Sequence, residues 1–266
     1  MCSSDLRRLK PSTAASGSLS KASNADTSAS ALSGFIALRA SAREWITVHT
    51  LPFFSTLTAM TASIDWYFDF VSPFSYIALH RLNEFSQKIV YRPVLFAGLL
   101  NHWGQKGPAE IPAKRRWTYR WCTWWARELG IPFRFPAEHP FNPLMHLRLA
   151  IACDCRPEAV KRIFDDLWMS GANATDPARV QALCRELGVD PADLAAEKIK
   201  TALRRNTEEA TARGVFGVPS FEVDGEVFWG ADAIDFLKAF LEDQGVLRNE
   251  EMRRIDALPA GAARKP

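Results

Sequence analysis

The residue with the clearest chemical potential is Ser72, in the stretch Asp-Phe-Val-Ser-Pro-Phe-Ser-Tyr that runs from Asp69 to Tyr76. Ser72 stands where a helix N-cap is expected, and Pro73 stands at the first helical position. Both are preferred places for these residue types. A hydroxyl at a helix N-terminus lies beside free backbone N–H groups, which stabilise an anion such as a thiolate. Ser72 is therefore predicted to be either a plain helix cap or part of an anion site.

The elements that would position Ser72 are a strand before it and a helix after it. Residues 64–70 are rich in aromatic side chains and bounded by polar ones, which is typical of a strand. Residues 76–85 carry apolar side chains at helical spacing, and residues 88–95 form a second predicted strand. A helical crossover makes these two strands parallel. Pro93 cannot donate to the ladder, which places the second strand at an edge or near its end.

Helices are predicted for the middle of the chain. Residues 96–108 contain several glycines and are expected to form a loop, and a helix should follow over residues 112–130. In that helix tryptophans recur at helical spacing, which favours a buried core stripe over a ligand site. These residues are Trp117, Trp121, Trp124 and Trp125. Further helices, each beginning at or beside a proline, are expected over residues 142–152, 157–169, 176–187 and 191–213.

The last section returns to strands. Asp224-Gly225 lies between two apolar-rich runs, at residues 221–223 and 226–229, which is a strong hairpin signal. A final helix is expected over residues 233–242. The order indicates an α/β, thioredoxin-like fold with an all-helical domain inserted between the β-α-β half and the β-hairpin-α half. We assign residues 60–96 and 214–245 to the thioredoxin-like domain, 97–213 to the inserted helical domain and 246–266 to a flexible tail.

The composition of residues 1–59 differs from that of the rest. A Ser-, Ala- and Thr-rich run over residues 12–31 is typical of disorder, and no continuous apolar core of a secretory signal is present. We expect a disordered or spurious N-terminal extension, with Met60 as the true start. A transit peptide is the alternative.

The overall composition excludes several classes of partner. A net charge of +3 argues against nucleic acid, and the absence of an apolar run of about 18 residues argues against a membrane span. The five cysteines include no C-x-x-C pair, and Cys153-Asp154-Cys155 has no usual zinc spacing, so no metal site is predicted. Unpaired thiols in a reducing, cytoplasmic compartment are expected.

Four short motifs, in the right order, carry a family resemblance. They are Phe68-Asp69-Phe70-Val71-Ser72-Pro73-Phe74-Ser75-Tyr76, Ile111-Pro112-Ala113-Lys114, Phe216-Gly217-Val218-Pro219 and Trp229-Gly230-Ala231-Asp232. With the domain plan, residues 60–245 resemble the 2-hydroxychromene-2-carboxylate isomerases, relatives of the kappa-class glutathione transferases in the DsbA-like thioredoxin superfamily. The resemblance implies glutathione as cofactor, a small aromatic carboxylate as substrate, and a homodimer.

The resemblance also assigns a reaction. Thioredoxin-like oxidoreductases carry cysteines where this chain has Ser72 and Ser75, and a hydroxyl cannot form a disulfide. A serine there can instead donate a hydrogen bond to the thiolate of glutathione. The thiolate would add to the benzylic carbon of trans-o-hydroxybenzylidenepyruvate, allow rotation and ring closure, and leave again as 2-hydroxychromene-2-carboxylate forms. The alternatives are a kappa-like transferase that keeps the thioether, and a non-catalytic thioredoxin-like binding module.

Residue roles follow from the resemblance at matching positions. Ser72 would activate the thiol, and Val218, before Pro219, would pair through its backbone with the cysteinyl part of glutathione. The γ-glutamyl end would be held by Trp229, Gly230, Ala231 and Asp232. The residues expected on the substrate side are Lys114, Gln105 and Asn142. Plain structural roles are the alternatives: a helix cap for Asp232, an ordinary strand start for Val218 and a solvated side chain for Lys114.

Departures from the family pattern fall on the substrate side. Gly104-Gln105 replaces a frequent Gly-Asn, and Trp121 and Trp124 stand where many relatives carry an acid and an arginine. These changes make the predicted pocket more aromatic and leave the substrate's identity open. Asp69 ends the first strand beside the site, where a buried acid needs a partner or a raised pKa.

Overall fold

The strand from which the sheet extends is β1 (Ile64–Phe68). Its five residues are buried and alternate between faces: Trp66 and Phe68 enter a large core on one face, and Tyr67 enters a smaller core on the other. The computed structural model describes residues 63–262. Within them β1 pairs in parallel with β2 (Ile89–Pro93) and antiparallel with β3 (Ser220–Val223), which pairs antiparallel with β4 (Glu226–Trp229).

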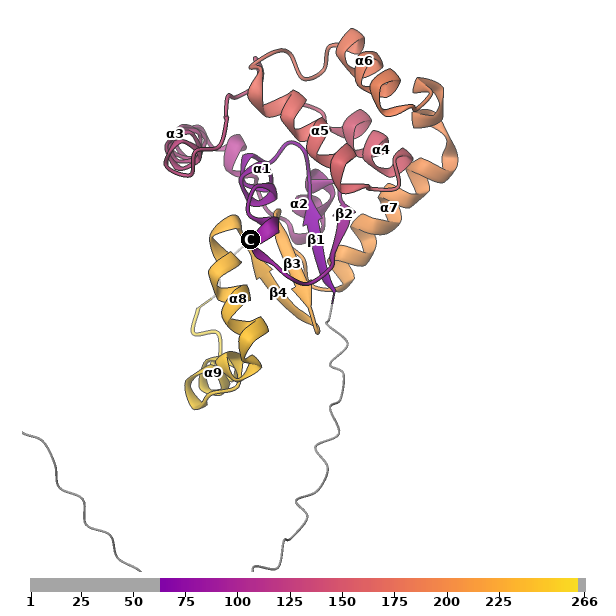
Figure 1. The fold of residues 1–266 in the computed structure, drawn as a ribbon. Coiled ribbons are helices and arrows are strands. Elements are labelled where there is room, and N and C mark those ends of the chain that lie inside the picture. Colours follow the sequence, from indigo (N-terminus) through magenta and orange to yellow (C-terminus); the bar gives the residue numbers. More distant parts are fainter. Residues whose placement is uncertain (1–62, 263–266) are drawn as a thin grey trace, which may run out of the picture. The chain divides into compact units, whose positions relative to one another are not determined.

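The strand order β2-β1-β3-β4 confirms the predicted thioredoxin-like fold (Figure 1). Pro93 is the last residue of β2, an edge strand, as its missing N–H required. The predicted hairpin joins β3 to β4. Asp224 has a φ of 53° and Gly225 a φ of 85°, the left-handed pair that a tight turn of this kind needs.

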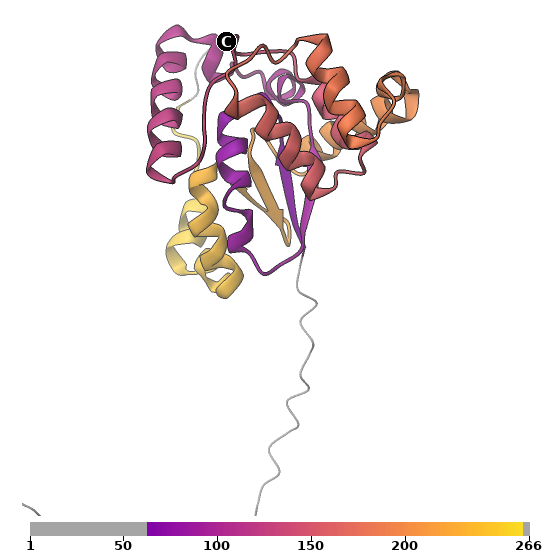
Figure 2. The same cartoon turned by 45° about the horizontal axis from the view of Figure 1, so that its top comes forward.

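Helices cover both faces of the sheet, as Figures 1 and 2 show. On the face that carries Trp66 lie α1 (Pro73–Leu79) and α8 (Ile234–Glu242). On the opposite face, α2 (Phe96–Trp103) and α7 (Glu197–Ala212) contribute Leu99 and Ala210 to the core around Tyr67. The two halves of the thioredoxin-like unit therefore share one sheet.

The chain between β2 and β3 is helical, as predicted. After α2 come α3 (Pro112–Glu128), α4 (Leu144–Ala152), α5 (Pro157–Met169), α6 (Pro177–Leu187) and then α7. The insertion is fastened to the sheet by α5. Phe164 packs on Phe70 with ring centroids 4.5 Å apart, and the Trp168 Nε1–H donates to the Phe70 carbonyl at 3.0 Å.

The loop predicted over residues 96–108 is wrong, because its first eight residues form α2. The prediction gave weight to the glycines and overlooked the helical spacing of Phe96, Leu99 and Trp103. Burial of Leu99 against α7 stabilises the helix. Gly104 ends it with a φ of 61°, the left-handed conformation common just after a helix.

The tryptophans of α3 are not the predicted buried stripe. Trp117 is 62% exposed and Trp124 is 45% exposed, whereas Cys122 and Ala126 make the buried contacts of this helix. The indoles stack along the helix surface instead, with the Trp117 and Trp121 centroids 5.6 Å apart. Helical spacing shows which side is apolar, but it does not show whether another element covers that side.

Other boundaries also differ from the predictions. The helix expected over residues 76–85 is α1, which ends at Leu79, followed by a short 3-10 helix (Leu82–Glu84). The helix expected over residues 191–213 is divided by Ala196, whose ψ of 138° is extended, into a short 3-10 helix (Pro191–Ala195) and α7. The tail expected to be flexible contains α9 (Glu250–Asp256), whose N-terminus is capped by the Asn249 side chain.

The four cysteines within the described residues are free thiols, as predicted: Cys122, Cys153, Cys155 and Cys184. No helix among residues 63–262 is long and apolar enough to cross a membrane. Cys2 and the predictions made for residues 1–59, including the start at Met60, lie outside the described residues.

His146 on α4 is 1% exposed, and neither ring nitrogen has a hydrogen-bond partner among the described residues. Burial lowers the pKa of His146 from 6.5 to about 4. Because the folded-state pKa lies below the unfolded value, stability is fully present above pH 6.5 and is lost as the pH falls towards 4. At a pH of about 4.5, this effect lowers the unfolding free energy by about 2–3 kcal/mol.

We therefore expect His146→Leu to flatten this acid dependence. The test is urea unfolding of the wild type and the variant at neutral pH and at a pH of about 4.5. Between the two pH values, the unfolding free energy of the variant should rise by about 2–3 kcal/mol relative to that of the wild type as the pH falls. A difference that is the same at both pH values would contradict the assignment.

Candidate functional site

Ser72 caps α1, as its sequence position predicted. Its backbone is extended, with a φ of −88° and a ψ of 116°, and its Oγ accepts a hydrogen bond from the Ser75 N–H at 3.2 Å. Pro73 occupies the first turn. Because α1 has only seven residues, the Ser72 hydroxyl matters more for a ligand than the dipole of so short a helix.

The carboxylate of Asp69 connects the two segments that surround Ser72. Its Oδ1 accepts from the Val71 N–H at 3.0 Å, and its Oδ2 accepts from the Phe96 N–H at 2.8 Å. Asp69 is fully buried, and burial raises its pKa to about 7, against the opposing effect of these two hydrogen bonds. A buried acid at this position was expected to have either a hydrogen-bond partner or a raised pKa, and Asp69 has both.

Val218 and Pro219 form the loop opposite Ser72, and the peptide bond between them is cis. The Val218 carbonyl accepts from the Ser72 Oγ at 3.4 Å. This contact exceeds the usual O–H···O range of about 2.5–3.0 Å and is weak. The Val218 N–H has no hydrogen-bond partner among the described residues. Both the Ser72 hydroxyl and the Val218 N–H therefore remain available to a ligand.

A cavity of about 760 Å³, here called the outer cavity, brings together most of the predicted site residues. It runs between α3 and the loops around β3 and β4. The predicted residues that line it are Gln105, Lys114, Val218, Pro219, Trp229, Gly230 and Asp232. The Lys114 and Asp232 side chains are exposed and form no ion pair within the described residues. Asp232 caps neither neighbouring helix, so its carboxylate is free for a cationic group.

A second cavity of about 290 Å³, the inner cavity, lies behind Ser72. Its walls are mainly apolar, and Tyr119, His139 and Asp69 add polar groups. The two cavities share a set of lining residues, namely Phe74, Phe96, Leu100, Pro108, Thr118 and Val218. Ser72 thus stands beside the junction of a wide cavity with several polar and charged groups and a narrower, more apolar one, the arrangement that a ligand with a peptide part and an aromatic part would need.

Three residues named in the sequence analysis lie away from both cavities. Ala231 is buried, and its carbonyl accepts from Arg81 at 3.3 Å. Asn142 is exposed and accepts from the Leu144 N–H at 3.1 Å, at the start of α4. Trp124 lines a shallow surface hollow instead, whereas Trp121 faces the outer cavity.

Sequence reasoning missed the wall that α2 provides. Phe96 and Leu100 line both cavities, and their helical spacing was the signal that could have identified them. It also missed Gly217. A Cβ there would lie 2.5 Å from the Trp229 Nε1, so only glycine permits the indole to pack against this loop.

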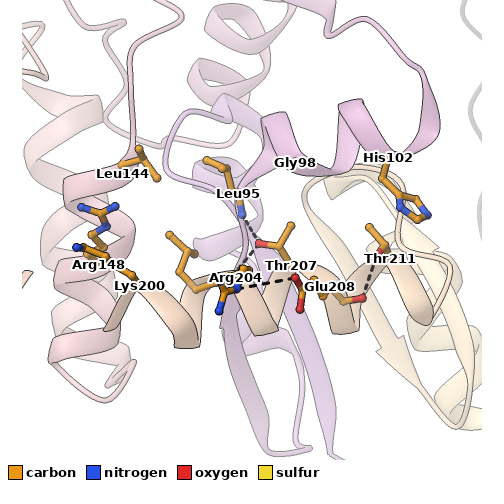
Figure 3. A pocket seen from close by; sticks show the side chains of 11 residues that line it. Leu95, Gly98, His102, Leu144, Arg148, Lys200, Arg204, Thr207, Glu208 and Thr211 are labelled. Carbon is orange, nitrogen blue, oxygen red and sulfur yellow. Dashed lines mark hydrogen bonds and ion pairs between the residues drawn. The ribbon is translucent and has the colours of Figure 1, made fainter. Parts of the chain in front are cut away.

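A third cavity, of about 360 Å³, lies between α2, α4 and α7 (Figure 3). The predicted site residues do not line it. Gly98 and His102 on α2 face this cavity, whereas Phe96 and Leu100 face the other two, so α2 is the dividing wall. Of its cations, Arg204 approaches Glu208 at 4.0 Å.

Comparison with known proteins agrees with this geometry. Residues 63–242 match the family described as DSBA-like thioredoxin domain. The chain is 31% identical to the 2-hydroxychromene-2-carboxylate isomerase of Sphingobium xenophagum, over 69% of this chain and 100% of that protein. It is 25% identical to glutathione S-transferase kappa 2 of Caenorhabditis elegans, over 71% of this chain and 96% of that protein.

A solved structure leads to the same family. The chain aligns with a selenomethionine-labelled 2-hydroxychromene-2-carboxylate isomerase with a TM-score of 0.61 and 25% sequence identity, over 71% of this chain and 98% of that one. The family resemblance seen in the sequence is therefore confirmed.

The buried Asp69 generates a prediction of its own. Because its folded-state pKa is raised to about 7 from 3.8, its contribution to stability is present at low pH and is lost as the pH rises towards 7. Between pH values of about 5 and 8, the unfolding free energy of the wild type should fall by about 2–3 kcal/mol relative to Asp69→Asn. Urea unfolding at the two pH values measures this.

Asp243→Asn is the matched control, because Asp243 also accepts a backbone N–H, from Gly245 at 2.7 Å, but is exposed. Its unfolding free energy should follow the wild type at both pH values. If Asp69→Asn does the same, burial does not control the pKa of Asp69.

Proposed function

The chain belongs to the DsbA-like thioredoxin family, together with the 2-hydroxychromene-2-carboxylate isomerases, and from this premise we propose that it is a glutathione-dependent isomerase of ortho-hydroxyaryl pyruvates. The proposed reaction interconverts trans-o-hydroxybenzylidenepyruvate and 2-hydroxychromene-2-carboxylate. The observation that carries the proposal is the position of the Ser72 hydroxyl, opposite the Val218 backbone and beside the junction of the two cavities.

The outer cavity fits glutathione by the chemistry of its donors and acceptors. The free N–H of Val218 would pair with the cysteinyl backbone, and the unpaired Asp232 carboxylate would accept the γ-glutamyl ammonium group. Lys114, across the cavity on α3, would bind a carboxylate. None of these three groups has a hydrogen bond or ion pair to another group within residues 63–262 that binding would have to break.

Glutathione, when bound, supplies the thiolate nucleophile that reversibly saturates the substrate's double bond. The chain's own contribution is the environment of that sulfur. The Ser72 Oγ–H can turn from the weak 3.4 Å contact with the Val218 carbonyl and donate to an anion instead. A hydrogen bond to the charged form lowers the pKa of a thiol, which raises the reactive fraction at neutral pH.

The inner cavity fits the aromatic part of the substrate. Its walls include Phe74, Phe96 and Phe141, and water would be displaced from them when a ring enters. Because the cavity opens beside Ser72, a ring there would present its side chain to the outer cavity. Gln105 and Lys114, which line the outer cavity, would then face the substrate's carboxylate.

A glutathione transferase that conjugates electrophiles is the second candidate, favoured by the 25% identity to the kappa 2 protein of Caenorhabditis elegans. One assay separates the two. Purified protein is supplied with trans-o-hydroxybenzylidenepyruvate, with and without glutathione, and free thiol is measured. Interconversion that requires glutathione but does not consume it supports the isomerase. Stoichiometric loss of thiol with an aryl halide supports the transferase, and inactivity in both assays refutes both.

We expect Ser72→Ala to lower the turnover of this isomerisation by about 10²–10³-fold, since removing one donor to a developing anion typically has that effect. The pKa of the bound glutathione thiol, followed by ultraviolet absorption, should rise in the variant. Loss of the helix cap should cost about 1 kcal/mol of stability.

Ser75→Ala is the control for that substitution. The Ser75 hydroxyl is also buried at the start of α1, but its Oγ has no hydrogen-bond partner within residues 63–262 and lines neither cavity. Turnover should stay within about twofold of wild type. Equal turnover in the two alanine variants would refute the role of Ser72.

Asp232→Asn should weaken glutathione binding about fivefold, the effect of losing an exposed charge pair worth about 1 kcal/mol. Binding of cysteinylglycine, which lacks the γ-glutamyl group, should be unchanged. Calorimetry with both ligands measures the difference, and Asp235→Asn, at an exposed acid outside both cavities, is the control. A similar loss for both ligands would contradict the assignment of Asp232 to the γ-glutamyl end.

A further inference from the structure

Tyr119 on α3 and His139, in the loop before α4, form a hydrogen-bonded pair in the wall of the inner cavity. The Tyr119 Oη lies 2.5 Å from the His139 Nδ1 and 2.8 Å from the His139 carbonyl oxygen. The His139 Nε2 lies 2.7 Å from the Val71 carbonyl oxygen. A carbonyl only accepts, so Nε2 carries a proton and Nδ1 of the neutral ring is an acceptor; the single Tyr119 hydroxyl proton is therefore shared between the His139 Nδ1 and the His139 carbonyl oxygen.

Packing fixes the orientation of this pair. The Tyr119 ring stacks on Phe135 with centroids 4.2 Å apart, and the His139 ring meets Trp168 edge-on at 5.6 Å. The Val71 carbonyl that holds His139 belongs to the residue directly before Ser72. The pair is therefore held in a fixed orientation in the wall of the inner cavity.

The acidic groups of the same cavity are already engaged. Asp69 accepts the Val71 and Phe96 N–H groups, and Glu110 accepts the Gly107 N–H at 2.6 Å. The Tyr119 hydroxyl gives its proton to His139, which leaves lone pairs on its oxygen that can accept from a ligand. Beside the Ser72 and Thr118 hydroxyls and the remaining Glu110 carboxylate oxygen, Tyr119 is thus an acceptor that this cavity offers to a donor on an aromatic ring.

We propose that Tyr119, positioned by His139, binds the phenolic hydroxyl of an ortho-hydroxyaryl substrate and accepts its proton during ring closure. This inference rests on the proposed function and deepens it. It restricts the substrate class to aromatic rings with a hydroxyl next to the reacting side chain, because a ring without that donor forgoes the hydrogen bond to the Tyr119 oxygen.

The proton transfer balances without any further reactant. As the phenolic oxygen attacks the keto carbon, its O–H bond breaks, the C–O bond forms and the carbonyl electron pair moves to the keto oxygen. Tyr119 takes the phenolic proton and passes its own to the His139 Nδ1. The new alkoxide is bonded to the same carbon as the attacking oxygen. The proton returns to it from His139 through Tyr119 and gives the hemiketal hydroxyl.

The electrostatic surroundings suit these roles. Burial lowers the pKa of His139, and Arg115 on α3 lowers it further, so the resting ring is neutral and can accept a proton. Burial raises the pKa of Tyr119, so its hydroxyl keeps its proton until a donor arrives. The acids that line the same cavity are Asp69 and Glu110.

A binding experiment tests the recognition step without relying on turnover. The probes are trans-o-hydroxycinnamate, which has the ring, the ortho hydroxyl and a carboxylate but no keto carbon, and trans-cinnamate, which lacks the hydroxyl. Calorimetry should show that the wild type prefers the hydroxylated acid by about tenfold or more. Tyr119→Phe, which keeps the ring stacked on Phe135, should lose that preference, and Tyr91→Phe, in β2 outside the cavities, should keep it.

Equal binding of the two acids by the wild type, binding of neither, or an unchanged preference in Tyr119→Phe would overturn the inference. His139→Gln separates positioning from proton transfer. Its amide can still donate to the Val71 carbonyl and accept from Tyr119, but it cannot store a proton, so the binding preference should survive while turnover falls by about 10²-fold or more.

The isomerase assay distinguishes a failure of this inference from a failure of the proposed function. If the wild type isomerises the substrate and Tyr119→Phe does so within threefold of its rate, the proton-transfer role is overturned while the isomerase stands. If the wild type binds glutathione but isomerises nothing, the proposed function fails and the proton-transfer step fails with it.

Discussion

The two hydrogen bonds of the buried Asp69 carboxylate are the contact on which the site depends. One oxygen holds the turn that delivers Ser72 to α1, and the other holds the first N–H of α2. These two segments are not adjacent in the sequence, yet together they form part of the wall shared by both cavities. Burying a carboxylate without hydrogen-bond partners for its oxygens has a large free-energy cost, and here both oxygens have a partner. The carboxylate therefore fixes the distance between the two segments.

The two cavities present different chemical groups. The outer one has a free N–H, a carboxylate and an ammonium group in its lining, and the inner one has mainly apolar walls, so under the proposed function they would hold a peptide and an aromatic ring. Val218 belongs to both, and Ser72 lies across from it. A site with this division can hold a hydrophilic nucleophile and a hydrophobic electrophile at once, because each is desolvated only by the surface that suits it.

Much of the fold followed from local signals. The aromatic-rich strand β1, the Asp224-Gly225 turn and the Ser72-Pro73 helix start each depend on neighbouring residues, so the sequence alone predicted them correctly. α2 was missed because its glycines outweighed its helical spacing, and no side-chain cap marks its start; its first N–H donates to Asp69, far back in the chain. The exposure of Trp117 was missed because periodicity says nothing about what packs on a face.

The site shows the same division. The residues that line the outer cavity lie in short contiguous motifs and could be recognised from them. Tyr119 and His139 are twenty positions apart and belong to no motif, and only the path of the loop between α3 and α4 brings them together. Asn142 was named for its neighbourhood in the chain, but its side chain is used to start α4.

The stacked indoles of α3 give the protein an optical property. Trp121 is the centre of this row: its ring centroid lies 5.0–5.8 Å from those of Trp117, Trp124 and Trp125. Transition dipoles at such separations couple, so the ultraviolet circular dichroism of this row depends on the mutual angles of the rings. Two of its members, Trp117 and Trp121, line the outer cavity. Two rings of this coupled cluster are therefore part of the wall of the outer cavity.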